Sequence, residues 1–571
     1  MTAPVGRSFA AEPIVVAGQL RKPWPERLVS CVVDQNVGLP DTATLTYEDE
    51  TRKVLAKTGI HIGTKLKVYA VTVKDRKREL LFDGEVTALE MDNDSTGSFI
   101  LIRAQSLANR LFRGRKVVAY HNMIAADIVR KVAAGAGMTT GRIETASITY
   151  PRLSQANVSD WEFLQGIAAE HGVTLHVDQK TGRLEMVRPK PASGAPDSST
   201  SAAGNPFVLQ FGANVTALRA AVTTSDRVNT VEVRGWDVST KTKIVSTESA
   251  ITSKTVDPDK KVPSPGVNTR LIVADTPYGS SAEADAVAKS VAASVSAGQA
   301  EIEAVVWGDP RLRAGVPVAL GSAGPEFSGK YTATAAHHVL DKSGYRTTVL
   351  VSTSPDRSLA GLVMGGNAPS RGPRMPGLAI GIVDEVGDPD GHQRGWVKLT
   401  FPWLSDTYKT DWVRTVQFGG TGGGGVFCPQ VKDEVLVGFE QGSLDAPYVL
   451  GGLYNGSDRP SRHDVSLVDG TKGNVNRMSL VSRGGQRLEL LDKNGGPAGV
   501  RLVTGDGNFE ITLDQQSDQI TISGPAGRSI TLSKSGITVD AGQGDLTLNG
   551  RTVTVNGELE VSVQGKIVRI N

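Results

Sequence analysis

The 571-residue sequence predicts a mainly β protein with an α+β N-terminal region, a small closed barrel and a C-terminal β-needle in which several copies intertwine. Three observations predict this class. Stretches of β-forming residues alternate with Gly, Pro, Asn and Asp along most of the chain. Three segments within 378–439 alternate apolar and polar residues at period two, as a small closed barrel requires. From residue 511 onward a short apolar-x-apolar unit recurs about every eight residues, which is the signature of a repeat array.

Composition limits the classes of function. The chain carries 62 basic and 60 acidic residues, a formal net charge of +2, so no global field attracts nucleic acid or an anionic membrane. Its 39% hydrophobic content allows several domains with cores of their own. Cys31 and Cys428 stand far apart without a CxxC companion, which predicts two buried free thiols and neither a disulfide nor a zinc site.

No targeting segment is visible. The N-terminus lacks a basic segment followed by an apolar core, and no run approaches the roughly 18 apolar residues of a spanning helix. We expect cytoplasmic assembly without a signal peptide, and a route other than general secretion to any site outside the cell.

Residues 1–188 are expected to form a first domain of strands with a helical insert. One helix is predicted over 122–134; a second follows Ser159, where Glu162 completes a capping box, and ends at Gly172. A hairpin of 173–177 and 184–187 comes next. The strands expected before the helices span 28–33, 43–47, 65–73, 80–91 and 98–107.

Two breaker-rich stretches divide the middle of the chain. Residues 189–206, rich in Pro, Ser, Ala and Gly, are predicted to be a surface loop or linker, and residues 366–376 a second linker. Between them, 207–365 should form a second domain with an Ala-rich helix over 282–297 that Gly298 ends. Its strands are expected at 207–209, 215–221, 228–236, 301–306, 316–320, 331–339 and 345–351.

The last third is predicted to hold the barrel, 377–456, a transition, 457–504, and the repeat needle, 505–571. In the barrel, the side chains expected inside alternate as Leu378/Ile380/Ile382, Val397/Leu399/Phe401 and Val435/Val437/Phe439. The transition carries strands at 478–481, 487–491 and 500–503.

Each repeat unit offers too little apolar surface to order itself. Two or three apolar side chains do not offset the ordering entropy of about eight residues, at roughly 1–2 kcal/mol each. The missing partner is most simply another copy of the chain. The unit Ile567/Ile570 closes the repeat, and Ile522, Leu532 and Leu548 are assigned inward, with Thr521 outward. The predicted needle core is Ile511, Leu513, Ile520, Ile522, Ile530, Leu532, Ile537, Val539, Leu546, Leu548, Val553, Val555, Leu559 and Val561.

The barrel segment resembles a known family. Phe401-Pro402-Trp403, the strand 432–440 with Val435, Val437 and Phe439, and the run 447–455 with Tyr448 and Asn455 are similar to the oligonucleotide/oligosaccharide-binding (OB)-type barrel of VgrG and phage central-spike proteins. Residues 228–351 are similar to phage tail-hub proteins. Two departures are Lys432, where the family more often has Gly, and the loop 419–425, which lacks the usual basic residue.

The resemblance implies tail-hub β-barrel domains, an OB-type barrel and a trimeric β-helix or β-prism needle. It implies a homotrimer that caps the inner tube of a contractile injection system, contacts tube and baseplate proteins, can carry cargo or an effector, and pierces the target membrane on contraction. A small PAAR-type tip protein is expected to dock at Arg569, Ile570 and Asn571. The system served, whether phage, type VI secretion or extracellular particle, stays open.

The sequence offers little support for catalysis, cofactors or metals. The stretch 420–425 satisfies GxGxxG but precedes a proline-broken strand, where a dinucleotide site needs a helix. His337 and His338 are adjacent on a strand and point to opposite faces. The acidic turn of Asp384, Glu385, Asp388 and Asp390 lacks EF-hand spacing. With no nucleophile elbow and no helical insert for an acid pair, we expect no enzyme.

Two binding functions compete with the structural one. Nucleic-acid binding would use the aromatic residues Trp396, Phe401, Trp403, Tyr408 and Trp412 with the cations Arg394, Lys398, Lys409 and Arg414. Asp384, Glu385, Asp406 and Asp411 cancel much of that positive charge, so no nucleic-acid binding is expected. The rival hypothesis is a surface-binding fibre that recognises glycan through its barrel or hub.

Overall fold

The computed structural model describes residues 13–18, 24–72, 76–224, 227–264, 266–351, 377–388 and 390–570. The predicted linker 366–376, the last residues of the second predicted domain and Asn571 lie outside them. The chain divides into two compact units, 1–453 and 454–571. The mainly β class is confirmed, and among the described residues no helix is long and apolar enough to cross a membrane.

A ten-stranded antiparallel sheet joins the two predicted hub segments. Its order is β1-β4-β5-β6-β3-β2-β21-β22-β18-β13, and β2 pairs with β21 so that Cys31 faces Leu340 and Val33 faces His338. Neighbouring strands of this sheet are therefore some 300 residues apart in the sequence. The strands are β1 (Ile14–Ala17), β2 (Leu28–Asn36), β3 (Thr42–Glu48), β4 (Lys65–Val71), β5 (Arg78–Asp94), β6 (Gly97–Gln105), β13 (Val215–Val222), β18 (Ala300–Trp307), β21 (Ala335–Asp341) and β22 (Gly344–Val351), with α1 (Val54–Thr58) beside them.

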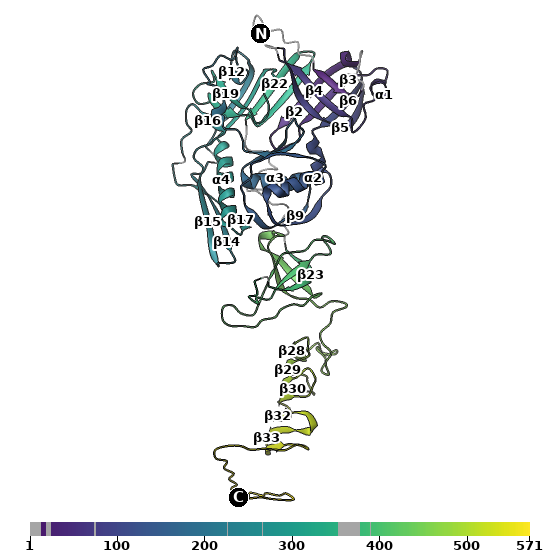
Figure 1. The fold of residues 1–571 in the computed structure, drawn as a ribbon, viewed down its shortest axis with the longest axis vertical. Coiled ribbons are helices and arrows are strands. Elements are labelled where there is room, and N and C mark those ends of the chain that lie inside the picture. Colours follow the sequence, from purple (N-terminus) through teal and green to yellow (C-terminus); the bar gives the residue numbers. More distant parts are fainter. Residues whose placement is uncertain are drawn as a thin grey trace. The chain divides into compact units, whose positions relative to one another are not determined.

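The helical insert, whose helices α2 and α3 are labelled in Figure 1, contacts both neighbours: the Gln165 side chain donates to Gly38 O at 2.7 Å, and Ala156 belongs to the barrel core. Ser159 and Glu162 form the predicted capping box at the start of α3, and Gly172 ends the helix in the left-handed conformation. α3 and α4 contact each other, and Ser290 of α4 donates to the Ala169 carbonyl. The elements are β7 (Lys116–Ile124), α2 (Ala125–Gly135), β8 (Thr140–Ile143), β9 (Thr149–Val158), α3 (Asp160–His171), β10 (Thr174–Val177), β11 (Leu184–Val187) and α4 (Ser281–Ala297).

Two expectations for the middle of the chain need correction. The strand predicted over 331–339 is two strands in different sheets, because the chain leaves the sheet of β20 at Thr332 and enters the ten-stranded sheet at Ala335. The stretch 189–206 is mostly exposed, as predicted for a surface loop, but it is not a free linker, because Ala192 is buried and its N–H donates to Lys254 O at 2.8 Å. Small side chains let this backbone approach its neighbours closely.

Two smaller sheets complete the hub. One has the order β15-β14-β17 and packs on α4; the other has the order β12-β19-β20-β16. Their strands are β12 (Val208–Gln210), β14 (Thr230–Asp237), β15 (Thr242–Ser249), β16 (Val256–Pro258), β17 (Arg270–Tyr278), β19 (Pro317–Gly321) and β20 (Gly329–Thr332).

The barrel consists of β23 (Leu378–Gly387), β24 (Trp396–Thr400), β25 (Arg414–Thr415), β26 (Glu434–Phe439) and β27 (Pro447–Gly452), in the order β24-β23-β26-β27-β25. Paired backbone hydrogen bonds between Val397 and Val413 bring the two edges together.

The face predicted for the first barrel strand is wrong. Leu378 and Ile380 point outward, 60% and 46% exposed, whereas Gly381 and Val383 are buried. A Cβ at position 381 would lie 3.2 Å from the Phe401 ring, so a glycine makes room for that ring in the core. The other two predicted sets, from β24 and β26, do face inward, with Phe439 partly buried.

The barrel is fixed to the helical insert through the β7–β9 ribbon. Ala156 belongs to the barrel's buried core. Ser154 N–H donates to Asp445 Oδ2 at 3.2 Å, and the Ser154 hydroxyl lies 3.0 Å from the Tyr408 hydroxyl. The guanidinium of Arg152 is 3.6 Å from Asp445 and stacks over the Tyr408 ring. Hub and barrel therefore share a packed boundary within the first unit.

The C-terminal unit contains a seven-stranded antiparallel sheet whose spatial order follows the sequence. Its strands are β28 (Arg477–Val481), β29 (Arg487–Asp492), β30 (Ala498–Val503), β31 (Glu510–Asp514), β32 (Gln519–Ser523), β33 (Ser529–Ser533) and β34 (Gly536–Asp540). The strand units predicted beyond Asp540 form no strand within the chain, because residues 545–570 make no backbone hydrogen bond there.

Candidate functional site: the apolar face of the C-terminal sheet

One face of the C-terminal sheet carries two continuous rows of apolar side chains. The strand registers place one residue of each row directly opposite the next across all seven strands. The first row is Met478, Leu490, Val500, Leu513, Ile520, Leu532 and Ile537. The second row is Leu480, Leu488, Leu502, Ile511, Ile522, Ile530 and Val539. We call these two rows the apolar face.

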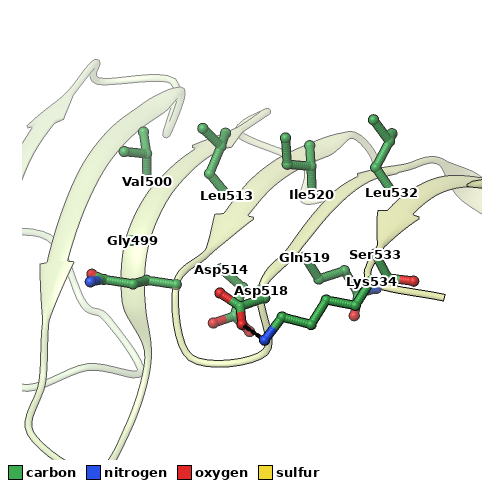
Figure 2. Close-up of a pocket in the computed structure, with 11 residues that line it drawn as sticks. Gly499, Val500, Leu513, Asp514, Asp518, Gln519, Ile520, Leu532, Ser533 and Lys534 are labelled. Carbon is green, nitrogen blue, oxygen red and sulfur yellow. Dashed lines mark ion pairs between the residues drawn. The ribbon is translucent and has the colours of Figure 1, made fainter. Parts of the chain in front are cut away.

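The apolar face is open in the single chain. Ile522 is 42% exposed, Leu532 38% and Ile537 72%. Figure 2 shows Val500, Leu513, Ile520 and Leu532 standing side by side, one from each of four strands, on the same side of the sheet. They line an open groove of about 540 Å³, at whose rim Lys534 forms an ion pair with Asp518. A contiguous apolar surface of this extent marks an interaction site in a soluble protein.

The opposite face of the sheet is polar. Its central row is Ser479, Glu489, Arg501, Thr512, Thr521, Thr531 and Thr538, again one residue from each strand. In each of the last four strands, the central residue is a threonine whose two neighbours in the sequence are apolar. Period-two alternation gives the sheet two chemically distinct faces, and only the apolar one requires a partner.

An ionic cluster around the buried side chains of His463 and Glu489 lies on the polar face near its first strands. His463 Nε2 lies 2.7 Å from Glu489 Oε1, and Arg501 Nε lies 2.8 Å from Glu489 Oε2 and pairs with Asp464 at 3.1 Å. Burial raises the pKa of Glu489, but hydrogen bonds from His463 and Arg501 outweigh it and hold the pKa below its usual value. The hydrogen bond from Arg501 lowers the pKa of Asp464 to about 2.

The predicted needle residues divide into two groups. Eight lie in the two rows: Ile511, Leu513, Ile520, Ile522, Ile530, Leu532, Ile537 and Val539. The other six lie in the segment without strands and are all exposed: Leu546, Leu548, Val553, Val555, Leu559 and Val561. Among the residues assigned to the tip, Ile570 is 91% exposed, Arg569 is exposed, and Asn571 is outside the described residues.

Sequence reasoning missed six members of the apolar face. Met478, Leu480, Leu488, Leu490, Val500 and Leu502 belong to the same rows but fell in the segment interpreted as a transition. The signal was present: Met-Ser-Leu, Leu-Glu-Leu and Val-Arg-Leu are the same apolar-x-apolar unit. Longer loops between these units hid the repeat.

The barrel motif residues have structural surroundings. Phe401, Val435 and Val437 are fully buried. Trp403 is half exposed, and its Nε1–H donates to the Ile380 carbonyl at 2.7 Å. The Tyr448 hydroxyl bonds to Arg414 and Glu440, and Asn455 caps a turn by accepting from Asp458 N–H at 2.7 Å. Pro402 is exposed beside Trp403.

The remaining candidates are engaged in local contacts. Lys398 pairs with Glu385, Lys409 with Asp384 and Arg394 with Asp388, all within 2.7 Å, so the cations of a nucleic-acid groove and the acidic turn neutralise each other. The glycine stretch 420–425 is a loop between β25 and β26 with no helix after it.

The histidine and cysteine predictions fare differently. His338 is buried and bonds to Thr347 and Tyr345, while His337 pairs with Asp34 on the opposite face, as expected from their adjacency. Cys31 is buried, but Cys428 is exposed, which corrects the prediction of two buried thiols. Across the part of the chain that the structure describes, no three His, Cys, Asp or Glu side chains gather in a metal-binding group.

Family models match the chain in two consecutive blocks. The model described as the type VI secretion system/phage-baseplate injector OB domain matches residues 379–454, and the phage baseplate V C-terminal trimerisation domain matches residues 477–560. A model described as the Alg8 N-terminal domain matches residues 60–342.

Curated relatives include two type VI secretion system spike proteins of Pseudomonas aeruginosa. VgrG2a is 33% identical over 100 residues, 16% of this chain and 12% of that protein; VgrG5 is 37% identical over 94 residues, 15% and 12% respectively. The matched region thus spans only about an eighth of the length of these relatives.

Solved structures that are similar to this chain include the E. coli c3393 protein, a component of the type VI secretion system (14% identity, 77% of this chain and 99% of that chain covered, TM-score 0.47). Another is the 43 kDa tail protein of prophage MuSo2 from Shewanella oneidensis (16% identity, 60% of this chain and 98% of that chain covered, TM-score 0.44). The resemblance to VgrG and phage central-spike proteins is confirmed by the two family matches and the curated relatives, which support a structural role in a phage-baseplate or type VI spike.

Proposed function

We propose that the chain is the hub-spike of a contractile injection system and works as a homotrimer held together by the apolar face. The observation that carries the proposal is the pair of seven-residue apolar rows, which lie in the block matched by a trimerisation domain. Three sheets packed face to face around one axis would bury all three apolar faces and leave the polar faces in water.

The energy available from this packing is large. Thirteen of the fourteen side chains of the apolar face are exposed, and Val500 is half-buried. Burying the remaining surface contributes about 1 kcal/mol per side chain, so each chain gains on the order of 14 kcal/mol before ordering costs. Such a gain supports an obligate assembly, since association itself costs an estimated 4–15 kcal/mol.

The mechanical part of the proposal rests on stiffness. The hub would sit on the inner tube and contact baseplate proteins, and the needle would pierce the target membrane when the sheath contracts. Continuous antiparallel ladders and the packed boundary at Arg152, Ser154 and Tyr408 support force transmission through the first unit. Edges covered by neighbouring copies would resist peeling.

We propose no reaction and no cofactor. The curated relatives are named as spike proteins, and the polar groups of the barrel are occupied by one another. We infer assembly in the cytoplasm of the producing cell, followed by incorporation into an injection particle.

The molar mass of the purified protein in solution tests the proposed trimer. Light scattering on the purified chain should give three times the monomer mass of 60.3 kDa, and the trimer should resist unheated detergent. A monomer that binds glycan would overturn the proposal in favour of the surface-binding fibre.

We also propose that a separate tip protein binds the needle and that the spike can carry cargo or an effector. Arg569 and Ile570, which lie outside any strand, would offer backbone groups to an added β-element of a small PAAR-type protein. Removing residues 566–571 should abolish capture of that protein while the trimer persists. Capture that survives the deletion would place the docking site elsewhere.

A further inference from the structure

All four Asn–Gly dipeptides of the chain lie in its C-terminal unit, and none lies in residues 1–453. They are Asn455-Gly456, Asn494-Gly495, Asn549-Gly550 and Asn556-Gly557. Asparagine is a chemically labile residue. It is most labile before glycine, because glycine has no Cβ to hinder the approach of its backbone nitrogen to the asparagine side chain. The C-terminal unit therefore concentrates the most reactive amides of the chain.

The reaction of such a dipeptide needs only water. The glycine backbone nitrogen loses its proton and attacks the side-chain carbonyl carbon of the asparagine. The new C–N bond closes a five-membered succinimide ring, and the side-chain nitrogen leaves as ammonia. Water then opens the ring at either carbonyl, which gives aspartate or isoaspartate. Either product carries a carboxylate where the asparagine carried a neutral amide.

Hydrogen bonds hold the Asn455 side chain away from this reaction. Its Oδ1 accepts from the backbone N–H groups of Ser457 at 2.8 Å and Asp458 at 2.7 Å. Its Nδ2 donates to Asp458 Oδ2 at 3.0 Å, and its own backbone N–H donates to Asp458 O at 3.0 Å. In such a turn the asparagine side chain is bound to the backbone that follows it. Its carbonyl carbon reaches the nitrogen of Gly456 only after these bonds break.

The other three asparagines have no such restraint. Asn494, Asn549 and Asn556 are exposed. Within the part of the chain that the structure describes, their side chains accept and donate no hydrogen bond, and the N–H groups of the glycines that follow them donate none. Asn494 lies in the loop between β29 and β30, where Gly495 has a φ of +70°. Both reacting groups are therefore free at each of these sites.

We propose that Asn494, Asn549 and Asn556 are sites of spontaneous deamidation in the folded protein and that Asn455 is not. Three conversions in one chain turn its formal net charge of +2 negative. Isoaspartate also lengthens the backbone by one atom, and the two downstream sites each follow directly on an apolar-x-apolar unit. The modification is separate from the proposed spike function.

Peptide mapping by mass spectrometry tests the proposal on the full-length protein after incubation in mildly alkaline buffer. The three proposed sites should show the small mass gain that accompanies replacement of NH2 by OH. Asn455 should react at least about tenfold more slowly, because its hydrogen bonds must break first. Asn474 is exposed but is followed by the β-branched Val475, so it serves as an internal control and should stay unmodified. A rate at Asn455 equal to that at Asn494 would overturn the proposal.

Incubation in concentrated urea separates the effect of the fold from that of the sequence. All four Asn–Gly sites should then react at similar rates, because unfolding removes the turn at Asn455. An Asn455 that stays slow in urea would show that its hydrogen bonds are not the cause and would contradict the structural argument. Asn494→Gln is the matched variant: it should lose the mass gain at position 494 alone, since a glutamine would have to close a six-membered ring. A proposed site that remains unmodified while another reacts loses its assignment.

Discussion

A charge placed in the apolar face should break the trimer, and the same charge one residue away should not. Ile522 sits in the second row between Ile511 and Ile530, whereas Thr521 lies on the polar face between Thr512 and Thr531. Ile522→Asp would bring three carboxylates toward the common axis. Burying an unpaired ion costs several kcal/mol even after relaxation, so three copies lose about 9 kcal/mol per trimer if each costs about 3 kcal/mol. Thr521→Asp should cost less than about 1 kcal/mol, because its carboxylate stays in water.

Native mass spectrometry and unheated detergent gels measure the outcome. Ile522→Asp should give monomer or aggregate at concentrations where Thr521→Asp remains a trimer. Lowering the pH should partly restore the Ile522→Asp trimer, because a buried carboxyl is neutral up to a raised pKa. Equal behaviour of the two variants would refute the assignment of faces, and loss of the trimer in Thr521→Asp alone would reverse it.

Three further predictions concern other parts of the chain. Arg152→Leu leaves Asp445 buried without its cation and should lower the free energy of unfolding of the first unit by about 3 kcal/mol in denaturant titrations, with partial recovery in Arg152→Leu/Asp445→Leu. Because the pKa values of Asp464 and Glu489 are lowered in the folded state, their contribution is full above the unfolded value of about 4 and is lost as the pH falls toward about 2. Circular dichroism should show acid unfolding of the C-terminal unit in that window, with a weaker pH dependence in Asp464→Asn. Gly499→Ala should destabilise the C-terminal sheet, since φ is +138° and the new Cβ would lie 1.8 Å from Leu513 O; Gly470→Ala, in open space, should not.

Local alternation was readable from the sequence, but the inner face of a strand was not. In β24 and β26 the large apolar residues are the buried ones, so alternation and burial agree. In β23 the large residues Leu378 and Ile380 lie outside, and the core position beside Phe401 is held by Gly381, where a Cβ would lie 3.2 Å from the Phe401 ring. The space left by neighbouring side chains in the assembled barrel decides which face of a strand points inward. The sequence pattern of a single strand contains no information about that space.

Long-range pairing was equally hidden. Helix ends at Ser159, Gly172 and Gly298 follow from side-chain and backbone chemistry within a few residues, and the structure places them as expected. The pairing of β2 with β21 depends on contacts some 300 residues apart, for which a strand's own sequence gives no signal. The two hub segments therefore share a sheet that the domain boundaries drawn from composition did not foresee.

The C-terminal unit shows why the repeat itself was the most informative feature. Apolar-x-apolar units predict strands wherever they occur, but a strand exists only when its backbone has a partner. Up to Asp540 the chain supplies that partner, and beyond it the same pattern continues in residues that have none of their own. The repeat pattern therefore could not show at which residue pairing within the chain ends.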